Sequence, residues 1–295
     1  MSIVAVFLAL ALGVVMGTTV VKQGVIEQLR SRTDAAVKTT HLLQQEVNQL
    51  RTDVNTWEKF STEAQPILVT SQLSGEQVVM VTIQGVDLPE VDGVRRALQQ
   101  SGATVVGILE ATSRMALTDS RAQSDMAAVL GVPVTDQATL AAAAARTLGE
   151  RLASGPPVAS QDPLQQFING DFVSLLGGSG SAAALGVSGQ LFVFVAGGTQ
   201  TPAVSPETFL VPVLTQLVNQ SRPTAAVETE ASTYPFVSLI RADGSLNGHL
   251  TTVDNADTGP GRVAVVLGLR DLLRNPAAGG NYGVKSGSSR VIPSP

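Results

Sequence analysis

The sequence predicts an α/β protein in three parts: an N-terminal transmembrane helix, a coiled-coil stalk continuous with it, and a layered α/β domain with a mostly parallel sheet. Three observations predict this order: an uncharged apolar run over residues 2–21, a heptad pattern over residues 22–65, and alternating strand and helix patterns over residues 66–274. A tail over residues 275–295 is rich in Gly, Ser, Asn and Pro and is expected to be unstructured.

The apolar run is interpreted as a membrane anchor in contact with lipid. A helix of 20 residues spans roughly 30 Å, the thickness of a bilayer core. A cleaved signal peptide is the alternative, but the best cleavage pattern, at residues 9–11, lies inside the run. Gly13 and Gly17 form a small-xxx-small pattern that would let two membrane helices approach closely. Positive charge begins after the run, at Lys22, which by itself favours a cytoplasmic domain.

A heptad pattern follows the apolar run and keeps its register for five heptads. β-branched residues at position a with mostly Leu at position d favour two parallel strands. The pattern therefore predicts a parallel homodimer or a higher oligomer, with Thr33 and Thr40 completing the a positions. The predicted interface residues are Ile26, Leu29, Ala36, Leu43, Val47, Leu50, Val54 and Trp57. A single amphipathic helix packed on its own globular domain is the alternative, because the two threonines and Ala36 weaken the N-terminal half of the seam.

Beyond Pro66, strand patterns alternate with helical patterns. The run over 77–83, a helix over 89–101 and a strand over 103–109 form a βαβ unit, which implies a parallel pair. This alternation is typical of a Rossmann-like layered domain. Further strands are expected over 190–196, 225–230 and 250–253, and further helices over 125–130, 138–152, 163–176, 207–219 and 260–273.

Composition excludes several classes of function. With 19 Lys and Arg against 24 Asp and Glu, the net charge of −5 does not suit a partner made of nucleic acid. The absence of cysteine excludes disulfide scaffolds, zinc ribbons, iron–sulfur clusters and a cysteine nucleophile. Only His41 and His249 remain for imidazole chemistry.

In a sheet of this kind a ligand normally binds beyond the carboxyl ends of the strands. The segments expected there are 85–87, 110–112, 197–199 and 228–230, and none of them forms a phosphate loop. Residues 178–183 match G-x-G-x-x-A by letters, but they follow a helical pattern and are interpreted as a flexible loop.

Two further motifs complete the search for chemistry. No G-x-S-x-G elbow is present to support a serine hydrolase. The acidic loop over 254–262 is interpreted as a helix cap, with Asp257 or Thr258 supplying the oxygen. The sequence therefore predicts no catalytic residue, no cofactor site and no metal site, and a protein that is not an enzyme.

Three segments resemble the actinobacterial MctB copper transport protein family: the apolar run over 5–17, the heptad region, and the C-terminal residues 253–258 with 261–264 and 266–267. The resemblance covers nearly the whole chain. It implies a membrane protein of the cell envelope, with its domain on the extracytoplasmic side, acting as a channel that limits intracellular copper. Relatives in this family that are SteB-like imply an alternative. In that case the protein would be a coiled-coil partner in septal cell-wall remodelling, pairing with a SteA-like protein and influencing a peptidoglycan hydrolase.

The ligand inventory does not favour direct copper coordination. Copper(I) prefers thiolate and thioether ligands, and copper(II) prefers imidazole. The chain has no cysteine, and Met80, Met115 and Met126 are expected to fill the core. Copper is therefore implied by the resemblance alone. A transport component and an interaction protein remain as the two hypotheses.

Overall fold

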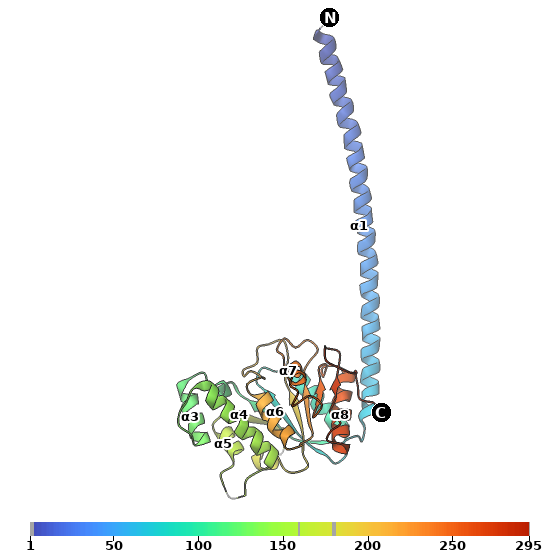
Figure 1. The fold of residues 1–295 in the computed structure, drawn as a ribbon. Coiled ribbons are helices and arrows are strands. Elements are labelled where there is room, and N and C mark those ends of the chain that lie inside the picture. Colours follow the sequence, from blue (N-terminus) through green and yellow to red (C-terminus); the bar gives the residue numbers. More distant parts are fainter. Residues whose placement is uncertain (1–2, 159, 179–180, 295) are drawn as a thin grey trace. The chain divides into compact units, whose positions relative to one another are not determined.

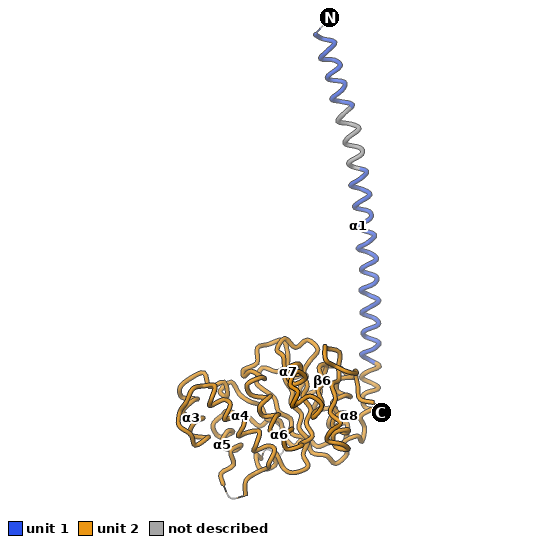
Figure 2. Tube along the Cα trace, in the orientation of Figure 1, with its two compact units in different colours: residues 1–59 blue, residues 60–295 orange. Residues whose placement is uncertain are grey.

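A computed structural model describes residues 3–158, 160–178 and 181–294, without the side chains of 17–26 and 178 (Figure 1). The chain divides into two compact units, residues 1–59 and residues 60–295, which are coloured separately in Figure 2. Helix α1 (Ile3–Val69) forms the first unit up to residue 59. Its last turns, residues 60–69, belong to the second unit. Pro66 lies inside this helix, so the helix continues beyond the expected end of the stalk at residue 65.

The predicted transmembrane helix over residues 2–21 is contradicted. Within the described residues, no helix is both long and apolar enough to cross a membrane. The side chains described at the start of α1, from Ile3 to Met16, carry no charge. Gly13 lies in this segment with open space beside it. The side-chain positions of Gly17 and Ile26 lie outside the described residues.

The second unit contains a seven-stranded sheet with the order β3-β2-β1-β4-β5-β6-β7. Its strands are β1 (Gln77–Ile83), β2 (Thr104–Ala111), β3 (Val173–Gly178), β4 (Leu191–Val195), β5 (Thr224–Val227), β6 (Thr251–Val253) and β7 (Asn281–Tyr282). Every neighbouring pair is parallel except β2 and β3, which are antiparallel. The prediction of an α/β domain with a mostly parallel sheet is therefore confirmed.

The sheet is built from short apolar runs because its central strands are covered on both faces. All of β4 is buried, and β1 is buried beyond its first residue. The helices of the second unit are α2 (Leu88–Gln100), α3 (Ser120–Leu130), α4 (Gln137–Ser154), α5 (Pro163–Asn169), α6 (Leu210–Asn219), α7 (Val237–Ala242) and α8 (Gly259–Arg274), with short 3₁₀ turns η1 (Ser113–Ala116) and η2 (Ala182–Ala184). Helix α2 packs against α8, and α4 packs against α6.

Two segments differ from the sequence-based expectation. The helix expected over 163–176 ends at Asn169, and the chain then enters β3. The turn between them places Asp171 at a φ of 57°, a left-handed conformation in which a helix cannot continue. The tail beyond residue 274, expected to be unstructured, contributes β7 and pairs Tyr282 with Arg290 in an isolated bridge.

Candidate functional site

The predicted oligomer interface lies on the exposed surface of α1. Within the first unit, the large apolar side chains described at heptad positions a and d are between 45% exposed, at Val47, and 68% exposed, at Trp57. The hydroxyls of the two threonines at position a are satisfied inside the helix: Thr33 donates to the Leu29 carbonyl at 2.8 Å and Thr40 to the Ala36 carbonyl at 2.9 Å. These threonines therefore add no unpaired donor to the seam.

The carboxyl ends of four parallel strands come together in the second unit. The Ala196 N–H after β4 donates to Val227 at the end of β5, and the Glu228 N–H donates to Val253 at the end of β6. After β1, the Gln84 carbonyl accepts a hydrogen bond from the Ala203 N–H. The expected segments 85–87, 197–199 and 228–230 therefore meet at one edge of the sheet, and the segment 254–257 after β6 joins them there.

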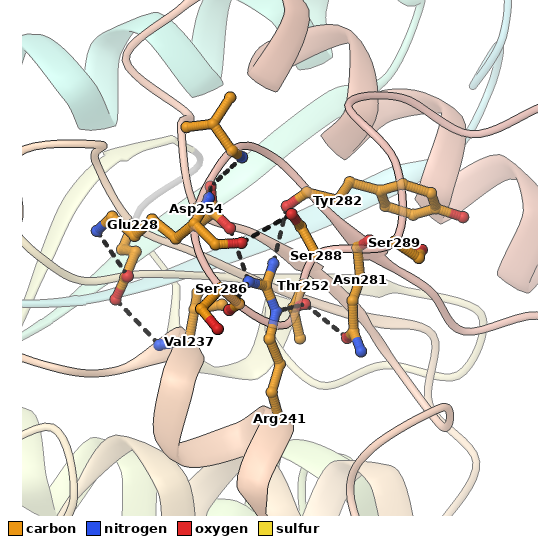
Figure 3. Close-up of polar contacts among 12 residues, drawn as sticks. Glu228, Val237, Arg241, Thr252, Asp254, Asn281, Tyr282, Ser286, Ser288 and Ser289 are labelled. Atoms are coloured by element: carbon orange, nitrogen blue, oxygen red, sulfur yellow. Dashed lines mark hydrogen bonds and ion pairs between the residues drawn. The ribbon is translucent and has the colours of Figure 1, made fainter.

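A buried ion pair joins α7 to the end of β6, as Figure 3 shows. Arg241 Nη1 lies 2.7 Å from Asp254 Oδ2, and the two side chains are 5% and 0% exposed. The other Arg241 nitrogens donate to the Thr252 hydroxyl and to the Tyr282 carbonyl. Asp254 Oδ1 accepts the N–H groups of residues 284 and 285. A buried charge is costly unless it is fully paired, and this network pairs both charges.

A second ionic contact fixes the tail to the end of β5. Lys285 Nζ lies 2.9 Å from Glu228 Oε1 and 2.7 Å from the Thr229 carbonyl. The other carboxylate oxygen of Glu228 accepts the N–H groups of Phe236 and Val237 at the start of α7. The tail therefore closes over the carboxyl edge of the sheet, where the charge of Lys285 is paired.

Glu90 differs from these groups because its side chain is buried without a partner. It is 4% exposed, and neither carboxyl oxygen has a hydrogen-bond partner among the described residues. Burial is the main reason that the pKa of Glu90 is raised from 4.5 to about 9. Lys285 lowers this pKa, and three carboxylates raise it: Asp257, Asp87 and Glu228. Near neutral pH the side chain is therefore an uncharged carboxylic acid.

The first turn of α2 explains how Glu90 comes to lie in this environment. Asp87 and Glu90 occupy the N-cap and third positions, where a D-x-x-E pair commonly caps a helix through its side chains. Asp87 makes no side-chain cap. A Cβ on Gly198 would lie 3.1 Å from Asp87 Oδ2, and the φ of Gly198 is +129°. Glycine at this position lets the loop after β4 pass close to the Asp87 carboxylate.

The acidic loop before α8 caps that helix. The Thr258 hydroxyl accepts the N–H of Gly261 at 3.2 Å, which confirms that one of the two predicted residues is the cap. Asp257 instead accepts the Glu230 N–H at 2.9 Å and joins this loop to the loop after β5. The acidic loop is therefore a structural connection between two strand ends.

The three methionines of the second unit lie in the core, as the sequence predicts. Met80, Met115 and Met126 are at most 1% exposed. His41 lies in the first unit and His249 in the second, and both are exposed. Among the described residues, no three His, Cys, Asp or Glu side chains are grouped so that they could hold a metal ion. The donor set in this part of the chain does not suit copper.

Sequence reasoning placed the strand ends correctly but missed three of their principal side chains. Arg241 and Lys285 lie far along the chain from some of their partners, and Lys285 was assigned to the unstructured tail. Glu90 carried a local signal, since it stands three residues after Asp87, but that spacing also describes an ordinary helix cap. The spacing of Asp87 and Glu90 therefore indicated a helix cap and gave no sign that Glu90 is buried without a partner.

Comparisons with known proteins agree along the whole length of the chain. A family model described as copper transport outer membrane protein, MctB, matches residues 1–293. The protein named copper transporter MctB from Mycobacterium tuberculosis (strain ATCC 25618 / H37Rv) is 24% identical over 306 residues. The protein of the same name from Mycobacterium leprae (strain TN) is 27% identical over 314 residues. Each alignment covers 98% of this chain and 96% of the relative.

Proposed function

Because the chain belongs to the MctB family, described as copper transport outer membrane proteins, we propose that it is a non-enzymatic cell-envelope component of copper efflux. In this proposal the protein is a parallel homodimer formed by α1, and it presents its α/β domain to a protein partner. It supports copper efflux through this assembly, without holding copper on its own side chains. The observation that carries the proposal is the exposed heptad seam of α1.

The seam supports self-association because its side chains are mostly apolar and its threonine hydroxyls already have hydrogen-bond partners. Its leucine and valine side chains are about half exposed on one helix, and exposed apolar groups gain free energy when a second helix covers them. The Thr33 and Thr40 hydroxyls already donate within their own helix, so burying them leaves no donor unpaired. β-branched residues at a and leucine at d then favour two parallel strands.

Among the described residues, the absence of grouped metal-binding side chains supports an indirect role in copper handling. The sulfur atoms that copper(I) would prefer belong, in the second unit, to methionines packed in the core. The carboxylates of Glu228 and Asp254 are occupied with backbone N–H groups, Lys285 and Arg241. A non-enzymatic role is consistent with this edge of the sheet, where Glu228, Asp254 and Asp257 bind other groups of the fold.

The proposal is tested by complementing a deletion strain with two variants. The first combines Met80→Leu, Met115→Leu, Met126→Leu and His249→Gln, which removes the soft and imidazole groups of the second unit. Leucine nearly conserves the volume of methionine, and His249 is exposed, so the fold should lose little stability. We expect this variant to restore copper tolerance as well as the unaltered chain does.

The second variant, Leu43→Glu with Leu50→Glu, places charges in the seam and should impair copper tolerance. Its matched control is Gln45→Glu with Thr52→Glu, which adds the same charges at position f of the same heptads. Protein abundance is measured in every strain, because a destabilised chain is degraded. Loss of tolerance in the first variant at normal abundance would contradict the proposal. A seam variant that disturbs septal morphology but leaves copper tolerance intact would favour a role in cell-wall remodelling.

A further inference from the structure

A cavity of about 720 Å³ lies beyond the carboxyl ends of the strands, in the second unit. Its walls are η1, the first turns of α4, the segment 203–209 and the first turn of α6. Turn η1 follows β2 and the segment 203–209 follows β4, and these two strands flank β1 on opposite sides. The cavity therefore sits near the point where the strand order reverses, which is where open α/β sheets bind their ligands. Its volume falls in the range of small-molecule sites, about 300–1,000 Å³.

The surface of this cavity is mostly hydrocarbon. Met115 and Phe209 are its large apolar lining residues, and both are almost fully buried. Helix α4 contributes Ala138, Ala141 and Ala142, whose side chains end at Cβ and so leave the volume open. An occupant would gain free energy chiefly by removing this surface from water.

The carboxylate of Asp136 and the side-chain amide of Gln137, two polar groups on the wall, already have partners. The Gln137 side-chain amide donates to the Ala116 carbonyl at 2.7 Å. The Asp136 carboxylate caps α4 by accepting the Thr139 N–H at 3.0 Å and the Thr139 hydroxyl at 2.7 Å. These hydrogen bonds lower the pKa of Asp136, so its carboxylate stays negatively charged at the rim.

The first turn of α6 is also poorly suited to bind an anion. Helix N-termini bind phosphate through free N–H groups. In α6 the Val211 N–H donates to the Pro206 carbonyl, and Pro212 has no N–H to offer. A sheet position that commonly holds a phosphate is here lined with hydrocarbon and carries a negative charge at its rim.

We propose that this cavity binds an uncharged alkyl or acyl chain. The apolar wall provides the binding free energy, and the Asp136 carboxylate discriminates against chains with an anionic head group. This site lies outside the strand-end ion network, and it is separate from the proposed role of the α1 seam.

The test uses the whole 295-residue chain and the uncharged fluorescent probe N-phenyl-1-naphthylamine. Dodecanol, dodecanoate and phosphatidylcholine vesicles then compete with the probe. We expect saturable binding of the probe, displacement by dodecanol, and displacement by dodecanoate at a concentration at least tenfold higher. Competition by vesicles as well as by dodecanol would identify bilayer lipid as a source of the chain. Competition by dodecanol alone would identify a free neutral ligand.

Variants connect the binding to the cavity. Ala138→Phe with Ala142→Phe fills it from exposed positions of α4 and should weaken probe binding at least tenfold. Ala128→Phe makes the same change at an exposed position of α3 outside the cavity wall and should leave binding unchanged. Asp136→Asn retains a capping side chain. In this variant dodecanoate should displace the probe at nearly the same concentration as dodecanol.

Circular dichroism spectra check that each variant is folded. If the double variant is unfolded, the single variant Ala138→Phe replaces it in the binding test. Three results would overturn the proposal. They are the absence of saturable binding to the unaltered chain, equal binding by the folded filled variant, and equal competition by dodecanoate and dodecanol.

Discussion

Replacing Glu90 with Gln should remove a large pH dependence from the stability of the second unit. The carboxyl of Glu90 has a pKa of about 9 in the folded chain and an ordinary value of 4.5. The folded state therefore binds one more proton than the unfolded state between these pH values. The stabilising effect of this proton is fully present below about pH 4.5 and is lost as the pH rises toward 9.

The size of the effect follows from the linkage relation. One proton of difference changes the free energy of unfolding by about 1.4 kcal/mol per pH unit. Between pH 6 and pH 8, both inside the interval, Glu90 should therefore cost roughly 3 kcal/mol of folding stability. The other ionisable groups contribute to both chains alike, so the difference between the two pH profiles isolates this residue.

The assay is urea unfolding followed by circular dichroism at pH 6 and pH 8. Glu90→Gln should flatten the profile relative to the unaltered chain and gain relative stability as the pH rises. Glu207→Gln makes the same chemical change at an exposed glutamate and should leave the profile unaltered. Parallel profiles for the unaltered chain and Glu90→Gln would refute the reasoning.

Three further predictions concern the carboxyl edge of the sheet. Arg241→Met should lower the free energy of unfolding by about 3–5 kcal/mol, because the buried Asp254 carboxylate loses its cation; a loss in denaturant unfolding below about 1 kcal/mol would contradict this. Gly198→Ala should cost about 1–3 kcal/mol in the same assay, because φ is +129° and the new Cβ would lie 3.1 Å from Asp87 Oδ2; no loss would mean that the loop shifts freely. Removing residues 275–295 should lower the melting temperature in calorimetry, since β7 and the N–H donors to Asp254 are lost; an unchanged melting temperature would show that the tail is dispensable.

The hydrophobic periodicity of the sequence was sufficient to predict β1 and α2. The strand over 77–83 has the bounds found for β1, and α2 lies within one residue of its expected ends. Their apolar residues repeat with the period of a buried strand and of an amphipathic helix, which sequence alone displays. The segment 163–176 was misassigned because the helical period of its first half carried the interpretation past Asp171 into β3.

The sequence predicted where the candidate site lies in the fold, but only some of the side chains that form it. Parallel strands bring their carboxyl ends to one edge, so the loops after β1, β4 and β5 could be grouped from sequence. The partnership of Glu228 with Lys285 joins residues 57 positions apart, and no local period encodes such a contact. The apolar cavity was also hidden, because its walls come from three separate segments of the chain.

The molar mass of the purified 295-residue chain in sedimentation equilibrium tests the central claim most directly. The unaltered chain and the control with Gln45→Glu and Thr52→Glu should sediment as dimers. The seam variant with Leu43→Glu and Leu50→Glu should sediment as a monomer, because a buried unpaired charge at position d is costly. A monomeric unaltered chain, or a seam variant that remains dimeric, would contradict the account.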